Sequence, residues 1–239
     1  MPEILLDILA IAAHRDDVEQ TCGGTLLKAA QRGQRTGILD LTQGEMGTRG
    51  TAEDRAREAE DAAGILGADW RRALDIPDGR VENTWENRLK VASVIRETRP
   101  RVVILPYWKG RHPDHYTCSV LGYEACFLAG LAKLDPKTAP HRPFKIIYAT
   151  LYYDVRPTFV VDISQQFEQK FASILAYKSQ FSDQAAGKDL FPAHDEIHAR
   201  VESMARYYGA LGGVTYAEPF LQKEVGLVED LLAIPVKSI

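Results

Sequence analysis

The feature that most constrains this chain is a short polar turn that directly follows an apolar run. Residues 4–12 are rich in Ile, Leu and Ala, are interrupted only by Asp7, and predict a buried parallel strand. Residues 13–19 then read Ala-His-Arg-Asp-Asp-Val-Glu. Ionisable side chains at this point lie at the carboxyl edge of a sheet, which is where open α/β sheets bind ligands. We therefore expect a functional site at the end of the first strand.

A second polar cluster, Arg-His-Pro-Asp-His at 111–115, follows another apolar run at residues 102–106. Two strand ends thus carry imidazole and carboxylate groups, the donors that catalytic zinc sites use together with one open position for water. His14, Asp17 and one histidine of the second cluster would complete three protein ligands. A carboxylate beside the ion, such as Asp16, could take a proton from the bound water. This arrangement suits hydrolysis of an amide or an ester.

Other roles for the same residues stay open on the sequence alone. An Asp after a strand often caps the next helix, and His115 could pack at the start of such a helix. The two strand ends could also bind an anion or a sugar without chemistry. A His-x-Asp-Asp turn does not decide between these functions, because it is less specific than the HExxH motif of metalloproteases.

Apolar periodicity predicts strands that alternate with helices through about residue 135. The predicted strands span residues 4–12, 35–42, 70–74, 101–106, 144–151 and 158–163. The predicted helices span residues 24–31, 51–67, 83–99, 118–133, 165–178 and 193–208, with a loop at 209–220. This alternation is typical of parallel βαβ units. We expect one domain over residues 1–239, with a Rossmann-like three-layer α/β fold and a largely parallel sheet.

Composition excludes several functional classes. The net charge of −4 gives no electrostatic basis for binding nucleic acid or an anionic membrane. No apolar stretch approaches the roughly 20 residues of a spanning helix, and no basic residue precedes His14 as a secretory signal would require. The 3 cysteines have no CxxC spacing, which argues against a disulfide framework. We therefore expect a soluble, cytoplasmic protein.

The two polar clusters, with Gly23 and Gly24 after the first, resemble the two signatures of the zinc-dependent LmbE/PIG-L-type N-acetylglucosamine deacetylases. Residues 41–51 resemble the loop that follows the second strand in that family, and the likeness covers most of the chain. Three later segments, residues 162–164, 177–181 and 216–220, resemble one branch of that family. Enzymes of this branch take part in making bacillithiol and remove acetate from N-acetylglucosaminyl-malate.

The resemblance implies a cofactor and a set of ligands for it. The cofactor is one zinc ion per chain. Carried over by position, the ligands are His14, Asp17 and His115. The fold implied is again Rossmann-like, with the site at the carboxyl ends of the strands.

The resemblance also implies catalytic roles. Asp16 becomes the general base, and His112 becomes the residue that stabilises the oxyanion together with zinc. Asp114 would orient His112, and Arg142 would orient Asp16. Without the resemblance, Arg142 in its Pro-rich segment would be interpreted as a solvated loop residue.

Several further residues are assigned to the substrate or stay unassigned. Arg55 falls where the family has a substrate-contacting arginine, and a cation such as Arg55 or Arg49 at the mouth suits an anionic malate arm. Arg15 departs from the family, which often has Pro or a small residue there, and Arg15 could touch an acidic substrate. The region of His194 and His198 does not align securely, so their roles stay open.

The function implied is zinc-dependent hydrolysis of the N-acetyl group of an amino sugar, with N-acetylglucosaminyl-malate as the expected substrate. The alternatives of the same class are deacetylation of another N-acetylglucosaminide and amidase action on thiol conjugates. The alternative of a different class is a non-catalytic protein that binds a sugar or a metal. The resemblance further implies a homo-oligomer, either a trimer or a hexamer.

Overall fold

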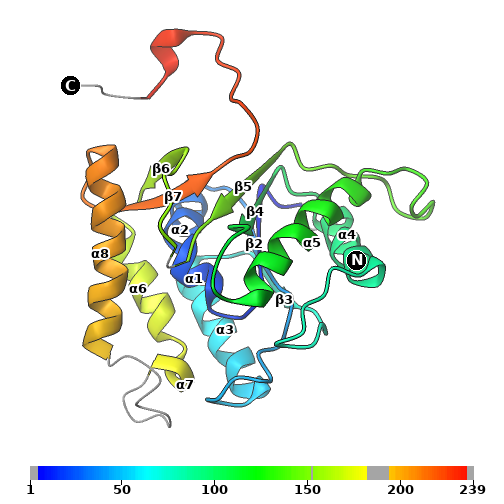
Figure 1. Ribbon diagram of the computed structural model, residues 1–239, viewed down its shortest axis with the longest axis horizontal. Helices are drawn as coiled ribbons and strands as arrows, with labels where there is room; N and C mark the ends of the chain where they lie inside the picture. Colours follow the sequence, from blue (N-terminus) through cyan, green and yellow to red (C-terminus); the bar gives the residue numbers. More distant parts are fainter. Residues whose placement is uncertain (1–4, 152, 182–193, 236–239) are drawn as a thin grey trace.

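A seven-stranded sheet in the order β3-β2-β1-β4-β5-β7-β6 forms the middle layer of the protein (Figure 1). The computed structural model describes residues 5–151, 153–181 and 194–235. The strands from β3 to β5 are parallel neighbours, while β7 runs antiparallel to both β5 and β6. The strands are β1 (Ile8–Ala12), β2 (Thr36–Asp40), β3 (Trp70–Ala73), β4 (Val102–Pro106), β5 (Lys145–Ala149), β6 (Phe159–Asp162) and β7 (Ala217–Leu221).

Helices cover both faces of this sheet (Figure 1). One face carries α4 (Trp85–Thr98) and α5 (Pro113–Ala129), which pack against each other. The other face carries α1 (Asp17–Thr21), α2 (Gly23–Gln31), α3 (Ala52–Leu66) and α6 (Phe167–Leu175). Beside them lie α7 (Lys178–Phe181), which contacts α3, and α8 (His194–Gly212), which packs on β6 and β7. Among the described residues, no helix has the length and apolar character needed to cross a bilayer.

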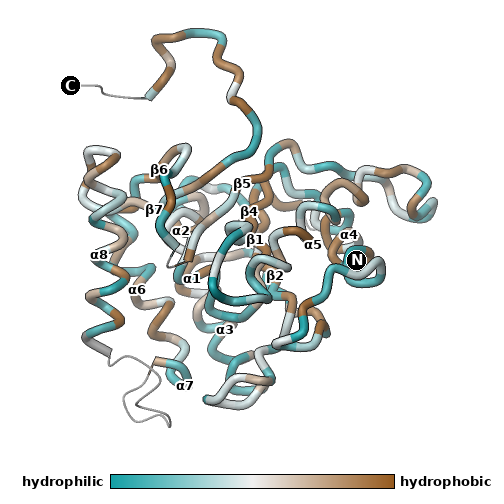
Figure 2. The backbone as a smooth tube through the Cα atoms, viewed as in Figure 1, coloured by the Kyte–Doolittle hydropathy of each residue, from teal (hydrophilic) through white to brown (hydrophobic). Residues whose placement is uncertain are grey.

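The three layers follow from strands that are apolar on both sides. Leu9 and Ile11 of β1 belong to the core under α4 and α5, while Ala10 and Ala12 belong to the core on the opposite face. All four side chains are at most 2 % exposed. Successive side chains of a strand point to opposite faces, so a strand buried on both faces is apolar throughout. The central strands are accordingly coloured as apolar in Figure 2. The prediction of a Rossmann-like three-layer fold is confirmed.

The predicted strands and helices are present, but the short helices α1 and α7 were not predicted, and two further regions differ from the prediction. The predicted loop at 209–220 is wrong at both ends, because residues 209–212 continue α8 and residues 217–221 form β7 in the middle of the antiparallel part of the sheet. The helix predicted at 118–133 begins earlier, at Pro113. Residues 4 and 193, at which two predicted elements begin, lie outside the described part of the chain.

The strand β7 lacks an apolar pattern because one of its residues caps a helix. The Glu218 carboxylate is buried and accepts hydrogen bonds from the backbone N–H groups of Gly24 (2.9 Å) and Thr25 (2.7 Å), at the start of α2. It also pairs with the Lys170 ammonium at 2.6 Å. A carboxylate at a helix amino terminus compensates unpaired N–H groups and the helix dipole. The polar residue therefore belongs to the interior, and no periodicity rule anticipates it.

The early start of α5 also has a local cause. The His112 side chain is the N-cap of the helix and accepts a hydrogen bond from the Asp114 backbone N–H at 3.2 Å. Pro113 occupies the first turn, where its missing N–H has no intrahelical partner to lose. The polar cluster at 111–115 therefore begins the helix, so its side chains are held by regular backbone rather than by a loop.

A buried ion network fixes α1 beneath the first polar cluster. The Arg71 guanidinium on β3 donates to Asp40 Oδ2 at 2.9 Å and to Glu19 Oε1 at 2.6 Å. The Tyr177 hydroxyl donates to the same Glu19 oxygen at 3.2 Å. Because Glu19 belongs to α1, this network ties the helix that carries Asp17 to two strands and to the segment before α7.

We predict that Arg71→Met destabilises the fold by about 3–5 kcal/mol, because it leaves the carboxylates of Asp40 and Glu19 buried without their cation. Urea unfolding measures the loss. The matched control is Arg72→Met, whose ion pair with Glu97 is at the surface, with side-chain exposures of 40 % and 38 %. That control should cost at most about 1 kcal/mol. Equal losses for the two variants would show that the buried network contributes no more than a surface pair.

Candidate active site

The strand order brings the two polar clusters together. The chain runs from β1 outward to β2 and β3, then returns to β4 on the other side of β1 and continues to β5. The order reverses between β1 and β4, which is where open α/β sheets leave a crevice for ligands. The first cluster follows β1, and the second begins α5 after β4. The structure therefore places both clusters at one point of the carboxyl edge, as the sequence predicts.

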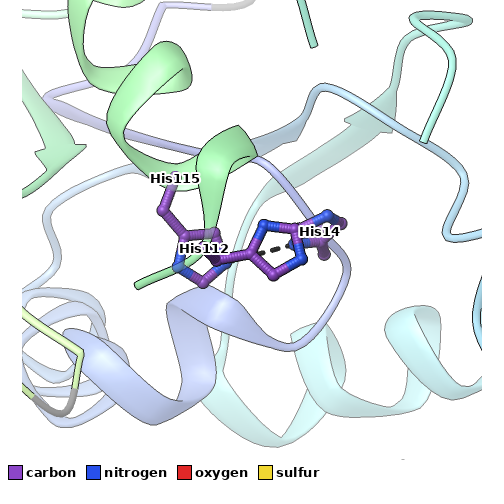
Figure 3. A group of neighbouring side chains, drawn as sticks. All are labelled: His14, His112 and His115. Carbon is purple, nitrogen blue, oxygen red and sulfur yellow. Dashed lines mark hydrogen bonds between the residues drawn. The ribbon is translucent and has the colours of Figure 1, made fainter. Parts of the chain in front are cut away.

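Three side chains from the two clusters, His14, Asp17 and His115, form a tight triangle in which each contacts the other two. His14 Nδ1 lies 3.2 Å from His115 Nε2 and 3.4 Å from Asp17 Oδ2. The other Asp17 oxygen lies 3.2 Å from His115 Nε2. Figure 3 shows the imidazole rings of His14, His112 and His115 gathered together, with the contact between His14 and His115 dashed.

The second nitrogen of His14 faces carboxylates. Its Nε2 atom lies 3.1 Å from Asp78 Oδ1 and 3.3 Å from Asp114 Oδ2. Asp114 is held in turn by the backbone N–H groups of Gly79 (2.8 Å) and Val81 (3.2 Å). Histidines that bind metals usually donate their other ring N–H to a carboxylate, which fixes the orientation of the ring. His14 has this arrangement.

Asp78 was not among the residues that the sequence predicted for the site. It lies in the turn Ile76-Pro77-Asp78-Gly79 that follows β3. A Pro-Asp-Gly turn after a parallel strand is recognisable, and it places the Asp at the same carboxyl edge as the two clusters. The sequence therefore indicates that Asp78 lies at this edge, but it does not indicate that Asp78 contacts His14.

The charges of this centre favour a cation. Burial alone lowers the pKa of His14, but hydrogen bonds to Asp114, Asp17 and Asp78 raise it to about 12. Burial raises the pKa of Asp17, yet the neighbouring His115 and His14 hold it well below its usual value. The carboxylates around His14 are thus ionised and concentrated in a buried place, which is the condition under which opposite charge is stabilised most.

A cavity of about 480 Å³ opens beside this centre. Six residues of interest line it: His14, Asp16, Asp17, Arg55, His112 and His115. Asp78 also reaches it, whereas Asp114 is not among the lining residues. The cavity has the size of a pocket for a small organic molecule.

Several sets of these donors could hold a metal ion. His14 forms one group with His112 and His115, and another with Asp78 and Asp114. The triangle with Asp17 and His115 is a third. A catalytic ion needs an open position towards the substrate. Among these residues Asp114 does not face the cavity, so the donors on the Nδ1 side of His14 are better placed for catalysis.

Asp16 is held by Arg55 at the edge of the cavity. An Arg55 Nη2 atom donates to Asp16 Oδ1 at 2.9 Å and to the backbone oxygen of Arg15 at 3.3 Å. Burial raises the pKa of Asp16 to about 6, and the opposing charge of Arg55 limits the rise. Gly44, at φ +73°, packs against the Arg55 guanidinium, and a Cβ there would lie 3.4 Å from Arg55 Cζ. The loop that contains Gly44 thus supports Arg55, the arginine that orients Asp16.

His112 stands beside the triangle with a defined protonation state. Burial, together with the nearby His14 and His115, lowers its pKa, so the ring is neutral at neutral pH. Its Nδ1 atom accepts the Asp114 backbone N–H at 3.2 Å, which leaves the proton on Nε2. Asp114 therefore contacts His112 through its backbone, while its carboxylate contacts His14 rather than His112. The predicted link between Asp114 and His112 exists, but through a different atom.

The predicted contact between Arg142 and Asp16 is wrong within this chain. Arg142 precedes β5 and so lies at the amino edge of the sheet, whereas Asp16 lies at the carboxyl edge. Its exposed guanidinium lies 4.8 Å from the centre of the Phe127 ring. The orienting contact comes from Arg55 instead. Substrate contact by Arg55 stays a prediction, since this side chain also lines the cavity.

Two other arginines hold loops rather than face the cavity. Arg49 is 6 % exposed and donates to the Gln180 backbone oxygen at 2.7 Å, and Gln180 donates back to the Arg49 backbone oxygen. Arg15 donates to the Ala52 backbone oxygen at 2.8 Å. Neither is among the residues that line the cavity, so the structure does not place Arg49 at the mouth, where it was expected, and contact of Arg15 with an acidic substrate stays a prediction.

The two unassigned histidines belong to α8. The His198 ring lies 4.5 Å from the Phe171 ring, and its Nδ1 atom lies 3.6 Å from Glu202. His198 is not among the residues that line the cavity. The side chain of His194 lies outside the described part of the chain.

Comparisons with known proteins agree with this geometry. A family model described as PIG-L, GlcNAc-PI de-N-acetylase, matches residues 9–126. The diacetylchitobiose deacetylase of Thermococcus kodakarensis is 33 % identical over 224 residues, covering 88 % of this chain and 80 % of that protein.

Two solved structures share the fold. The conserved protein TT1542 from Thermus thermophilus is 42 % identical with a TM-score of 0.85, covering 94 % of this chain and 98 % of that one. The N,N'-diacetylchitobiose deacetylase of Pyrococcus horikoshii, complexed with its inhibitor, is 26 % identical with a TM-score of 0.79, covering 89 % of this chain and 82 % of that one.

Fold, site and relatives together define a deacetylase-type α/β protein with a His/Asp centre at the carboxyl edge of its sheet. The chain belongs to the PIG-L family of deacetylases. The resemblance of the two polar clusters to the LmbE/PIG-L-type deacetylases is therefore confirmed at the level of the family.

We predict that Arg55→Gln lowers kcat for deacetylation about tenfold to a hundredfold, the value of one charge-assisted hydrogen bond of about 1.5–3 kcal/mol. KM should change little, because the contact is to Asp16 rather than to the substrate. Arg55→Lys keeps the charge without the planar guanidinium and should recover part of the rate. Steady-state kinetics separate the two constants. A rise in KM at constant kcat would instead make Arg55 a substrate-binding residue.

Proposed function

We propose that this chain is a zinc-dependent hydrolase that removes the N-acetyl group from N-acetylglucosamine-type substrates. The observation that carries the proposal is the triangle of His14, Asp17 and His115. Ligand atoms bound tetrahedrally to zinc at about 2.0–2.1 Å lie about 3.3–3.4 Å apart. His14 Nδ1 and His115 Nε2 lie 3.2 Å apart, and each lies close to one oxygen of Asp17, at 3.4 Å for Oδ2 and 3.2 Å for Oδ1, so the donors of the three side chains are gathered at about the spacing that such an ion needs.

The chemistry of the donors supports zinc at this place. Two imidazoles and one carboxylate form a common set for catalytic zinc, and harder ions such as Mg²⁺ prefer oxygen ligands alone. The carboxylates of Asp78 and Asp114 on the far nitrogen of His14 support the ligand role of its Nδ1 atom. We assign one zinc ion per chain to His14, Asp17 and His115.

The roles of the surrounding residues follow from their contacts. A divalent ion in this position would lower the pKa of a water molecule beside it and polarise the acetyl carbonyl group. Asp16 accepts the proton of the attacking water, and Arg55 keeps the Asp16 carboxylate in place. His112 donates its Nε2–H to the carbonyl oxygen as negative charge develops there. Asp114 fixes the rings of both His14 and His112.

The amide-bearing substrate is proposed from the relatives and from the cavity. The relatives include deacetylases of diacetylchitobiose, whose acetyl group is on an amino sugar. Lys109 and Arg111 line the cavity, so a substrate with an anionic arm has cations to meet. This supports N-acetylglucosaminyl-malate, and hence a place in bacillithiol synthesis. Deacetylation of another N-acetylglucosaminide and cleavage of thiol conjugates are the alternatives. A non-catalytic sugar- or metal-binding protein is the alternative of a different class.

We also propose a cytoplasmic location and a homo-oligomeric state for this enzyme. The absence of a spanning helix among the described residues is compatible with the first. The second is supported by a row of exposed apolar side chains along α5.

We predict that the purified protein contains close to one zinc ion per chain and that His115→Ala loses it. His112→Ala is the matched control, because this neighbouring imidazole lies outside the proposed ligand triangle and its loss should leave the ion bound. Elemental analysis of both variants measures the difference. If His112→Ala loses the ion and His115→Ala keeps it, the zinc ligand is His112 and the assignment of His115 is wrong.

The substrate is tested by acetate release from N-acetylglucosaminyl-malate and from N-acetylglucosamine. We expect the anionic substrate to be cleaved with the higher kcat/KM, because cations line the cavity. Asp16→Asn keeps the shape but removes the proton acceptor, and it should lower kcat by about two to four orders of magnitude with full zinc content. A preference for the neutral sugar would favour another N-acetylglucosaminide, and no acetate from either would favour a binding protein.

A further inference from the structure

The Asp16 carboxylate does not cap the helix that it precedes, although its position would allow this. Asp16 is the N-cap residue of α1, and its side chain makes no capping hydrogen bond. An Asp at such a position ordinarily accepts a backbone N–H group from the first turn of its helix. Here the side chain is 17 % exposed and lines the cavity instead. Its orientation therefore depends on other side chains.

Each oxygen of this carboxylate accepts a hydrogen bond from a different side chain. Asp16 Oδ1 accepts from the Arg55 guanidinium at 2.9 Å. Asp16 Oδ2 accepts from the side-chain amide of Gln20, with 3.2 Å between Oδ2 and Nε2. Gln20 follows Asp16 by four residues, a spacing at which Gln and Asp side chains on a helix can form a hydrogen bond. Gln20, which neither the sequence patterns nor the family resemblance assigned to the site, thus holds the second oxygen of Asp16.

The main chain of Gln20 is fixed by a buried ion pair behind α1. Its backbone oxygen accepts a hydrogen bond from the Lys170 ammonium of α6 at 3.0 Å. Lys170 is 3 % exposed and pairs with the Glu218 carboxylate of β7 at 2.6 Å. Because Glu218 also caps α2, the end of α1 is tied to two other helices and to the sheet. The Gln20 side chain therefore extends towards Asp16 from a backbone that has little freedom.

The two donors on Asp16 differ in charge, and this difference separates the roles of the two oxygens. The Arg55 guanidinium draws the negative charge of the carboxylate towards Oδ1 through a charge-assisted hydrogen bond. The Gln20 amide is neutral, so it orients Oδ2 without adding a second positive charge. A carboxylate oxygen has about two lone-pair sites, and one hydrogen bond leaves the other site of Oδ2 open. Asp16 Oδ2 is thus the oxygen better suited to accept a proton.

We propose that Gln20 is a positioning residue for deacetylation, whose side-chain amide holds Asp16 so that Oδ2 takes the proton of the attacking water. The inference rests on the proposed function, in which Asp16 is the general base. Gln20 acts through Asp16 and makes no contact with the reacting atoms. Lys170 and Glu218 support the same oxygen indirectly, because they fix the backbone from which Gln20 extends.

Substitution of Gln20 tests this role by steady-state kinetics. Gln20→Met keeps the length of the side chain and removes the donor, so kcat for acetate release should fall about tenfold at unchanged KM and zinc content. Gln20→Glu keeps the shape but sets a second carboxylate against Asp16, and kcat should fall further. Gln31→Met is the matched control, since this glutamine of α2 bonds Gln166 at 2.8 Å and does not line the cavity. It should keep the wild-type kcat.

A double-mutant cycle separates positioning from a general structural defect. Asp16→Asn already lacks the proton acceptor, so adding Gln20→Met to it should lower the residual rate by less than about twofold. Independent defects would multiply instead, since the effects of sites that do not interact are additive in free energy. A tenfold loss in both backgrounds would therefore overturn the proposal.

The contact itself is tested without activity, by the side-chain amide signals of Gln20 in an ¹⁵N–¹H spectrum of the purified protein. These signals are identified as the pair missing from Gln20→Met, and Asp16→Asn should shift them. An active wild type would overturn the role of Gln20 alone if Gln20→Met kept the full rate, if only KM rose, or if Asp16→Asn left the amide signals in place. A wild type that releases no acetate would overturn the proposed function, and this role with it.

Discussion

The two ring nitrogens of His14 are the point on which the site depends. One nitrogen meets Asp17 and His115, and the other meets Asp78 and Asp114. These partners come from α1, from the turn after β3 and from α5, so a single imidazole joins three segments that are far apart in sequence. The parallel sheet makes this possible, because all of its strands end at the same edge. A ring held on both sides has one orientation, which a metal ligand requires.

Much of this arrangement could be predicted from the sequence. Apolar runs that end in His and Asp predict both the positions of the strands and the carboxyl edge of the sheet, where these polar side chains lie. The meeting of His14 with His115 follows from those patterns once the strand order is known. The periodicity of the sequence does not show which side chain will contact a given residue in the folded chain. Arg55 lies on α3, 39 residues from Asp16. Its contact with Asp16 depends on the loop that contains Gly44, because this loop packs against the Arg55 guanidinium.

Two errors of prediction have a common physical origin in buried polar residues. Glu218 interrupts the apolar pattern of β7 because its carboxylate caps α2. Asp114 is assigned by resemblance to His112, yet its carboxylate is used by His14 and by two backbone N–H groups. Rules based on hydropathy treat such residues as surface. In a folded chain their burial is stable only because each has a specific partner, and that partner is set by tertiary structure.

The helix α5 connects the chemistry to the outer surface. Its first turn holds His112 and His115 at the cavity, its inner side completes the core, and its outer side carries apolar residues that the single chain does not cover. Exposed apolar surface of this kind is unfavourable in water and is retained where it is covered by another molecule. His112 and His115, which line the cavity, and these exposed apolar residues therefore belong to one structural element.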